Sequence, residues 1–224
     1  MTKDIDYQND TPGRYRNGQV NVADYLPPET GEEVRDLMKQ FVDRFSTPPI
    51  ANWDPIIRAL AAHFYLISIH PFADGNGRTS RAVEGLLLYQ AKVNARGFYS
   101  LANYYYQHRE MYVWNLDNAR FNTEGDLTPF IIFALRGLAS ELQSVHSDVL
   151  QEVKVISFRD FARETFFAHG LFNTRAGARG FHLLMSMNRD PVPMAEIYGH
   201  PIYKDIGRRT IQRDIKFLRE QNLV

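Results

Sequence analysis

Apolar residues recur at helical spacing through most of this chain, and this periodicity constrains its fold more than any other feature. Thr30 and Glu33 have the spacing of a capping box, in which each side chain satisfies a backbone N–H at a helix start. The apolar residues that follow are three or four positions apart: Val34, Leu37, Met38, Phe41, Val42 and Phe45. We therefore predict a helix that ends before Pro48.

The same spacing predicts further helices over residues 53–68, 77–93, 103–120 and 128–168, the last with a break near residue 150. Thr128 followed by Pro129 fits a helix start, because proline is tolerated in the first turn. Hydrophobic residues make up 44% of the chain, enough for an ordinary buried core. The predicted fold class is all-α.

One segment near the N-terminus carries a β signal. Short β-prone segments flank Asn17-Gly18, the residue pair that a type I′ hairpin turn favours. We therefore predict a small β-hairpin, or flap, over about residues 12–22. Residues 1–9 are expected to be loose.

A shift in composition near residue 170 divides the chain into two predicted domains, 1–170 and 171–224. The second domain reads as three short helices, at about 175–188, 193–198 and 207–222. A short helix, a turn and a basic last helix are typical of a helix-turn-helix. We therefore predict a winged-helix-like C-terminal domain.

The outward face of the last predicted helix is basic, with Arg208, Arg209, Arg213, Lys216 and Arg219. Such a face serves equally to bind DNA phosphates, to dock a protein or as a solvated surface. The sequence stops at Leu223-Val224, where a wing hairpin would start. We therefore favour DNA binding less than the other two interpretations.

Composition excludes several classes of protein. Lys+Arg and Asp+Glu each number 26, so the chain as a whole is not built to coat a polyanion. Without cysteine it has no disulfides and no thiolate metal site. The first ten residues are polar and acidic, unlike a signal peptide, and no run of about 18 apolar residues occurs. We expect a cytoplasmic protein.

The loop HPFADGNGRTSR, residues 70–81, concentrates the chemistry. Gly75, Asn76 and Gly77 precede a helix, where backbone N–H groups converge and the helix dipole favours an anion. Arg78 and Arg81 lie in the first turn, on one side of that helix. Cations there oppose the dipole, so a polyanion such as a triphosphate explains them better than stability does.

Two residues beside this anion site could take part in a reaction. Asp74 offers a carboxylate, the ligand with which proteins hold Mg²⁺ against phosphate oxygens. His70 ends the preceding helix, and neutral imidazole can accept a proton from a hydroxyl. Together these groups suit phosphoryl or nucleotidyl transfer.

The loop resembles the signature of the Fic-domain family, His-Pro-Phe-x-Asp/Glu-Gly-Asn-Gly-Arg-x-x-Arg, at every fixed position. The segment before it is similar to the flap and first core helix of that family, and RxxY at 109–112 with Leu116 resembles the helix beside its nucleotide pocket. The resemblance covers about residues 12–150. A winged-helix-like C-terminal appendage is common in the family.

This resemblance implies a Fic helical core and a protein adenylyltransferase, which transfers AMP from ATP to a Ser, Thr or Tyr hydroxyl of a target protein. His70 would be the general base, and Asp74 would hold Mg²⁺. Gly75, Asn76 and Gly77 would form the anion hole, with the Asn76 side chain also on phosphate.

The resemblance also implies the remaining contacts. Arg78 would bind phosphate and Arg81 would clamp the γ-phosphate. Tyr112 and Leu116 would line the adenine pocket, and the hairpin 14–22 would pair with an extended segment of the target. Family members that phosphorylate replace the glycine and arginine that stand here at 77 and 78, so AMP transfer is favoured.

Many relatives carry an inhibitory helix, Ser/Thr-x-x-x-Glu-Gly/Asn, whose Glu pairs with the last Arg of the loop motif. Ser80 to Gly85 fits this string, but it lies inside the helix that follows the loop. We expect Glu84 to be a surface partner of Arg81. No other match occurs, so we expect a chain without an inhibitor that modifies its own hydroxyls.

Two other functions stay open. The chain could be a DNA-binding regulator with an idle loop, or a Fic enzyme that uses another nucleotide or removes AMP. His63 is expected to be a core histidine rather than a group behind the site. A homo-oligomer is compatible with the sequence.

Overall fold

The computed structural model describes residues 13–22, 25–94, 97, 100–122, 125–187 and 192–224. The segment 1–9, which we expected to be loose, lies outside these residues. The chain divides into two compact units, Met1–Val145 and His146–Val224, and each is treated by itself.

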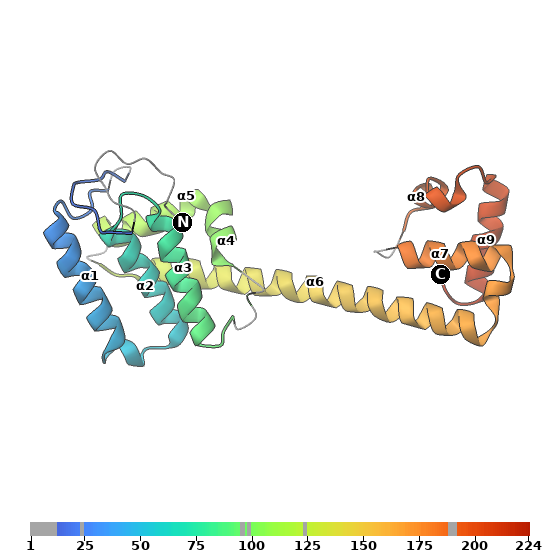
Figure 1. Cartoon of the computed structure of the whole chain (residues 1–224), viewed down its shortest axis with the longest axis horizontal. Helices are drawn as coiled ribbons and strands as arrows, with labels where there is room; N and C mark the ends of the chain where they lie inside the picture. Colours follow the sequence, from blue (N-terminus) through green and yellow to red (C-terminus); the bar gives the residue numbers. More distant parts are fainter. Residues whose placement is uncertain (1–12, 23–24, 95–96, 98–99, 123–124, 188–191) are drawn as a thin grey trace. The chain divides into compact units, whose positions relative to one another are not determined.

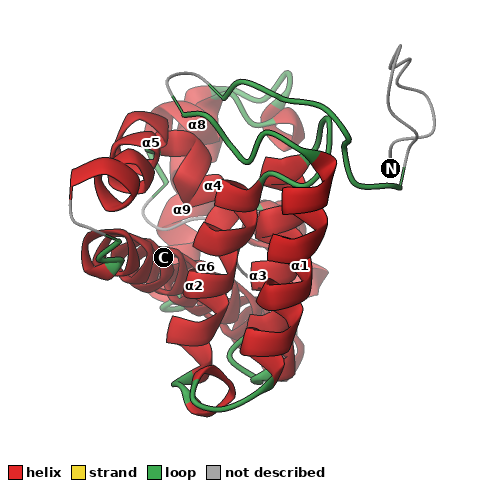
Figure 2. Cartoon of the chain, turned by 90° about the vertical axis from the view of Figure 1, so that its left-hand side faces the viewer, coloured by secondary structure: helices red, strands yellow, loops and turns green. Residues whose placement is uncertain are grey.

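The first unit is a helical bundle (Figures 1 and 2). Its helices are α1 (Gly31–Ser46), α2 (Pro55–Ile69), α3 (Asn76–Gln90), α4 (Leu101–Gln107), α5 (Arg109–Asp117) and the first part of α6 (Thr128–Ala168). The predicted helices are confirmed, with two differences. The predicted helix 103–120 is divided at His108, whose backbone is not helical, and the break expected near 150 is absent because α6 is continuous.

Helix α2 lies between its neighbours and is buried on most sides. The Asp54 side chain caps its N-terminus by accepting from the N–H groups of Ile56 and Ile57. Three clusters include its residues: one with Val34 and Met38 of α1, one with α4 and α6, and one with Leu116 and Phe130. The C-terminal end of α2, where the predicted active-site loop begins, is therefore held by tight packing.

The predicted flap hairpin is not found. Residues 13–22 contain no strand, and their one bridge pairs Val22 with Tyr25. Neither Asn17 nor Gly18 takes the positive φ that a type I′ turn needs. The physical reason lies at Arg16, a buried residue whose backbone N–H bonds to the Pro71 carbonyl, so that the segment pairs with the loop instead of with itself.

The second unit consists of the end of α6 with α7 (Arg175–Ser186), α8 (Met194–Tyr198) and α9 (Arg208–Glu220). These are the three short helices that the sequence predicts. Phe166, Leu183, Leu184, Ile211 and Leu218 form the centre of their core. No strand occurs at 146–187 or 192–224, so a wing is not supported. The composition shift near 170 falls just after α6, whereas the boundary between the compact units lies within it.

Across the described ranges, no helix combines the length and the apolar character that crossing a lipid bilayer requires.

Candidate functional site

A short loop joins α2 to α3, two helices that lie side by side (Figure 1). At its start, His70 takes a left-handed backbone conformation with φ 51°, which ends α2. At its end, Gly75 has φ 84°, a conformation that glycine adopts without strain, and α3 begins at the next residue. The loop therefore makes a sharp reversal that places His70 near the N-terminus of α3.

The imidazole of His70 is held in one tautomer. Its Nδ1 lies 3.2 Å from the Ile67 carbonyl oxygen, which can only accept, so Nδ1 carries the hydrogen. The lone pair is then on Nε2. Burial lowers the pKa of His70, the Ile67 carbonyl opposes that shift, and the positive charges of Arg16 and Arg120 add to it. A neutral imidazole with a free lone pair is the form that a general base needs.

Arg16 supports the start of this loop, although no motif in the sequence indicated it. Its guanidinium donates to the backbone carbonyls of His70, Gly18 and Pro28 at 2.7 Å each and of Ile69 at 3.4 Å. The side chain is fully buried. A single cation thus fixes the end of α2 to the N-terminal segment and leaves positive charge beneath His70.

Arg120 is a second cation that sequence reasoning missed. It lies on the π-helix Asn118–Asn122, its Nε donates to Ser68 Oγ at 3.1 Å, and its NH1 donates to Asp117. Its guanidinium carbon is 3.8 Å from the centre of the Tyr25 ring. Burial lowers the pKa of Arg120, but a guanidinium remains charged in proteins.

The Asn76 side chain closes the loop. Its Oδ1 accepts from the Phe72 N–H at 2.9 Å and its Nδ2 donates to the Phe72 carbonyl at 2.7 Å. Ser80 Oγ donates to the Asn76 carbonyl one turn further along α3. The resemblance assigned this amide to phosphate, but here its two polar atoms bind the backbone of Phe72. The Asn76 side chain therefore fixes the shape of the loop.

The two predicted arginines fold back over the start of α3. Arg78 donates to Asp74 at 2.9 Å, and both side chains are about half exposed. The guanidinium of Arg81 lies beside Gly77, where NH1 is only 3.2 Å from the position that a Cβ would take. Within the described residues, Arg81 makes no hydrogen bond or ion pair. The N-terminus of α3 is thus flanked by two cations and has no acidic residue in its first turn.

Tyr112 and Leu116, the predicted adenine walls, lie in the core. Tyr112 Oη is 2.8 Å from His63 Nε2, and burial raises the pKa of Tyr112 far above its usual value. Leu116 is 4% exposed and packs with Phe64 and Phe130. Both residues contact α2, through His63 and Phe64 respectively. Their part in an adenine pocket stays a prediction.

Glu84 is not on the helix surface, so the expectation that it pairs with Arg81 is wrong. It is buried, and its Oε2 accepts from Tyr105 Oη at 2.9 Å. The same oxygen lies 2.7 Å from Nδ1 of the fully buried His63, although this contact lacks the alignment of a hydrogen bond. His63 is a core histidine, as expected. Glu84 and His63 form one buried polar cluster with Tyr105 and Tyr112.

Groups of three or more His, Cys, Asp or Glu that could enclose a metal ion do not occur in the part of the chain that the structure describes. Asp74 is therefore not a member of such a group among these residues. A carboxylate of this kind fits Mg²⁺ that also takes water and substrate phosphates as ligands.

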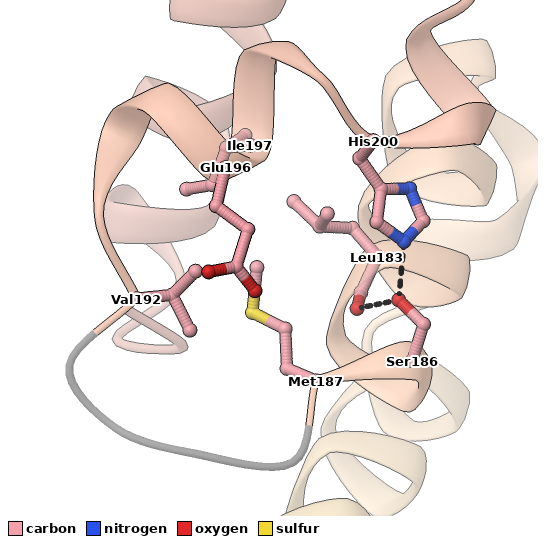
Figure 3. Close-up of a pocket in the computed structure, with 7 residues that line it drawn as sticks. All are labelled: Leu183, Ser186, Met187, Val192, Glu196, Ile197 and His200. Carbon is pink, nitrogen blue, oxygen red and sulfur yellow. Dashed lines mark hydrogen bonds between the residues drawn. The ribbon is translucent and has the colours of Figure 1, made fainter.

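The second unit has a separate pocket of about 310 Å³, lined by Leu183, Ser186, Met187, Val192, Glu196, Ile197 and His200 (Figure 3). Ser186 Oγ is 2.8 Å from His200 Nε2, which suggests a nucleophile and its base. However, His200 Nδ1 accepts from the Ile202 N–H, so Nε2 carries the hydrogen and donates to Ser186, whose hydroxyl donates to the Leu183 carbonyl. This tautomer cannot activate the serine.

Comparison with known proteins shows similarity to one family over part of the chain. Residues 2–88 match the model of the Fic/DOC family. The chain is similar to a protein named protein adenylyltransferase Fic from Aedes aegypti, 36% identical over 121 residues, and to one of the same name from Nematostella vectensis, 37% identical over 124. The matches cover 54% and 55% of this chain but only 22% and 27% of those proteins.

Solved structures agree with this result. A Fic family protein from Desulfovibrio desulfuricans G20 superposes with a TM-score of 0.56 and 26% identity, covering 66% of this chain and 44% of that one. Fic-1 from C. elegans superposes with a TM-score of 0.50 and 30% identity, covering 62% and 38%. The part of the chain that matches the Fic/DOC family model, residues 2–88, contains α2, the loop and most of α3.

Proposed function

We propose that this chain transfers AMP from ATP to a hydroxyl of a protein. The observation that carries the proposal is the tautomer of His70, which leaves the lone pair of Nε2 available near the N-terminus of α3. The relatives named above are called protein adenylyltransferases, which supports the choice of nucleotide and acceptor.

The phosphates of ATP would lie at the N-terminus of α3. Backbone N–H groups around Gly75 and Gly77 and the dipole of α3 favour negative charge there. Arg78 and Arg81 lie over this point. Because Arg81 has no carboxylate partner among the residues described, it can bind the terminal phosphate without first breaking an ion pair.

Asp74 would hold Mg²⁺ with the help of the nucleotide phosphates. Its side chain is half exposed and forms an ion pair with Arg78, a surface contact of low strength. The ion would neutralise charge on the phosphates and help to orient them. Arg78 could then exchange its contact with Asp74 for one with a phosphate oxygen.

The reaction follows from this arrangement. Nε2 of His70 accepts the proton of the target hydroxyl while the hydroxyl oxygen attacks the α-phosphorus. A new P–O bond forms, the bond from the α-phosphorus to the bridging oxygen breaks, and pyrophosphate leaves. The N–H groups at the start of α3, with Arg78 and Arg81, stabilise the charge that develops on the phosphate oxygens. Positioning and electrostatics therefore supply most of the rate.

The target segment would lie along residues 17–21. These residues are mostly exposed, and their backbone N–H groups form no hydrogen bonds within the described part of the chain. The segment directly follows Arg16, whose side chain binds the His70 carbonyl at the start of the loop. Main-chain pairing with an extended target would bring its hydroxyl to the loop without a preformed hairpin.

Incubation with Mg²⁺ and ATP labelled at either the α- or the γ-phosphate tests this function. We expect label on protein, including the chain itself, from α-labelled ATP alone, and its loss in His70→Ala. The exposed His108→Ala, which removes a histidine outside the loop, is the matched control. Transfer of the γ-label would show phosphorylation instead, and equal labelling of wild type and His70→Ala would refute the base. A panel of other nucleotides at equal concentration tests the preference for ATP.

A further inference from the structure

Helix α9 has two chemically distinct faces. Ile211, Asp214, Ile215 and Leu218 are buried against the rest of the second unit. The opposite side presents five exposed cations, called here the basic face: Arg208, Arg209, Arg213, Lys216 and Arg219. Because buried and basic positions alternate with helical spacing, packing of the apolar side turns every one of these cations outward.

The one carboxylate in the middle of α9 is turned inward. Asp214 is fully buried and receives two hydrogen bonds from Arg179 of α7, from Nε at 2.7 Å and from NH2 at 2.9 Å. This bidentate pair fixes the rotation of α9 about its own axis. Of the other acidic residues, α9 exposes only Glu220, 3.9 Å from Lys216 at its C-terminal end. The basic face therefore keeps a strong net positive charge.

Contacts with α8 order the first half of this face. The guanidinium carbon of Arg208 lies 5.4 Å from the centre of the Tyr198 ring, and Gln212 Nε2 donates to Tyr198 Oη at 3.4 Å. An arginine that is already positioned loses less side-chain entropy when it binds a ligand.

Stability of the helix does not explain this arrangement. Arg208 and Arg209 lie in the first turn, which has no acidic residue, so both oppose the helix dipole. Arg209 and Arg213 are four residues apart, where like charges repel by a few tenths of a kcal/mol. A polyanion bound along the helix would relieve both effects.

We propose that the basic face of α9 binds duplex nucleic acid through the phosphate backbone. The helix has 13 residues and is therefore about 20 Å long, a rod that fits the roughly 12 Å wide major groove of DNA with its cations towards the phosphates. Phosphate contacts from one helix do not require a wing, which was our reason to favour DNA less from sequence.

A lipid surface fits this face less well. A helix that lies on a membrane inserts large apolar side chains beside its cations. The apolar side chains of α9 are instead buried in its own unit, and none of the large exposed hydrophobic residues lies on it.

The test uses the whole chain and a labelled 25-base-pair duplex of random sequence, titrated by fluorescence anisotropy between 50 and 200 mM salt. If all five cations contact phosphates, the slope of log K against log [salt] is about −4.5, a loss of about 500-fold across this range. The double variant Arg209→Gln/Arg213→Gln should reduce the steepness of that slope by about 1.8. Circular dichroism melting checks that it folds.

The control is Lys39→Gln/Arg44→Gln, which removes the same charge from exposed positions of α1. We expect it to bind as the wild type does. Absence of duplex binding at 50 mM salt would overturn the proposal, as would equal weakening by the control. Binding that depends on Arg81 but not on α9 would place the polyanion at the loop and overturn it too. Binding to anionic vesicles without binding to duplex would favour a membrane and reject it.

Discussion

Nε of Arg16 donates a 2.7 Å hydrogen bond to the backbone carbonyl of His70. The contact joins residues 54 positions apart and ties the end of α2 to a segment that has no secondary structure of its own. Three more carbonyls accept from the same guanidinium. The left-handed conformation of His70, and with it the direction of the imidazole, therefore depends on one buried cation.

Replacement of Arg16 should destabilise the C-terminal end of α2 and the N-terminal segment that Arg16 ties to it. Arg16→Ala leaves buried carbonyls without donors, and we expect a loss of about 3 kcal/mol or more in the free energy of unfolding, measured by urea titration. Arg16→Lys should recover only part of the lost free energy of unfolding, because an ammonium group lacks the planar, forked geometry of a guanidinium. The exposed neighbour Arg14→Ala is the control, with a change within about 0.5 kcal/mol. Equal effects at both positions would contradict the supporting role of Arg16.

Arg81 should act on nucleotide binding and leave stability unchanged. It makes no hydrogen bond or ion pair with the described residues, so Arg81→Ala breaks neither kind of contact among them. Loss of a charge-assisted bond to phosphate should reduce kcat/KM for ATP by about 10- to 100-fold. Steady-state labelling and thermal melting measure the two effects, with the exposed Arg44→Ala as control. A large fall in melting temperature without ATP would instead show a structural role.

The acid limb of the pH profile of activity should lie below the usual pKa of a histidine side chain. Burial and two nearby cations lower the pKa of His70, so the base stays deprotonated to a lower pH than a free histidine, about 6.5. Activity should therefore persist as pH falls through 6.5 and disappear only below it. Arg120→Gln removes one of those charges and should move the limb to higher pH. A limb at or above 6.5 in the wild type, or no movement in the variant, would contradict this assignment.

The helices and the loop could be predicted because their signals are local. The capping box at Thr30 and Glu33 forms as its sequence indicates, with both reciprocal bonds present. The residues from His70 to Arg81 are contiguous in sequence, so the site that they form could be predicted without knowledge of the fold. By contrast, Arg16 and Arg120 reach the loop only through the fold, and no spacing along the chain connects them with it.

Polar residues on α3 misled the prediction for a physical reason. The buried face of α3 consists of Asn76, Ser80, Glu84 and Leu88, four residues apart and mostly polar. A reading that assigns apolar residues to the interior places Leu86 inside and Glu84 outside, yet Leu86 is 53% exposed. Hydrogen bonds from the loop and from Tyr105 make the polar stripe suitable for burial. Such partners become visible only in three dimensions.

Glu84 should be essential for stability although it is outside the reacting loop. Glu84→Ala leaves Tyr105 Oη without its acceptor and His63 without its charged neighbour, for a loss of about 3 kcal/mol in the free energy of unfolding. Tyr105→Phe should cost less, and the double variant less than the sum of both, because they share one contact. Leu86→Ala on the exposed side is the control. Additive effects in the urea-unfolding cycle would show that the contact does not couple these residues.

Asn76 allows its two assigned roles to be separated. If its amide holds the loop through Phe72, Asn76→Ala should lower the free energy of unfolding of the nucleotide-free protein by about 2 kcal/mol, because the Phe72 N–H and carbonyl lose their partners. Asn76→Asp should lower both the free energy of unfolding and the ATP affinity further. A carboxylate cannot donate to the Phe72 carbonyl, and it places negative charge at the proposed anion site. Urea titration without ATP measures the first effect and ATP affinity the second. If Asn76→Ala unfolds at the same urea concentration as the wild type and loses only ATP affinity, the amide binds phosphate and does not hold the loop through Phe72.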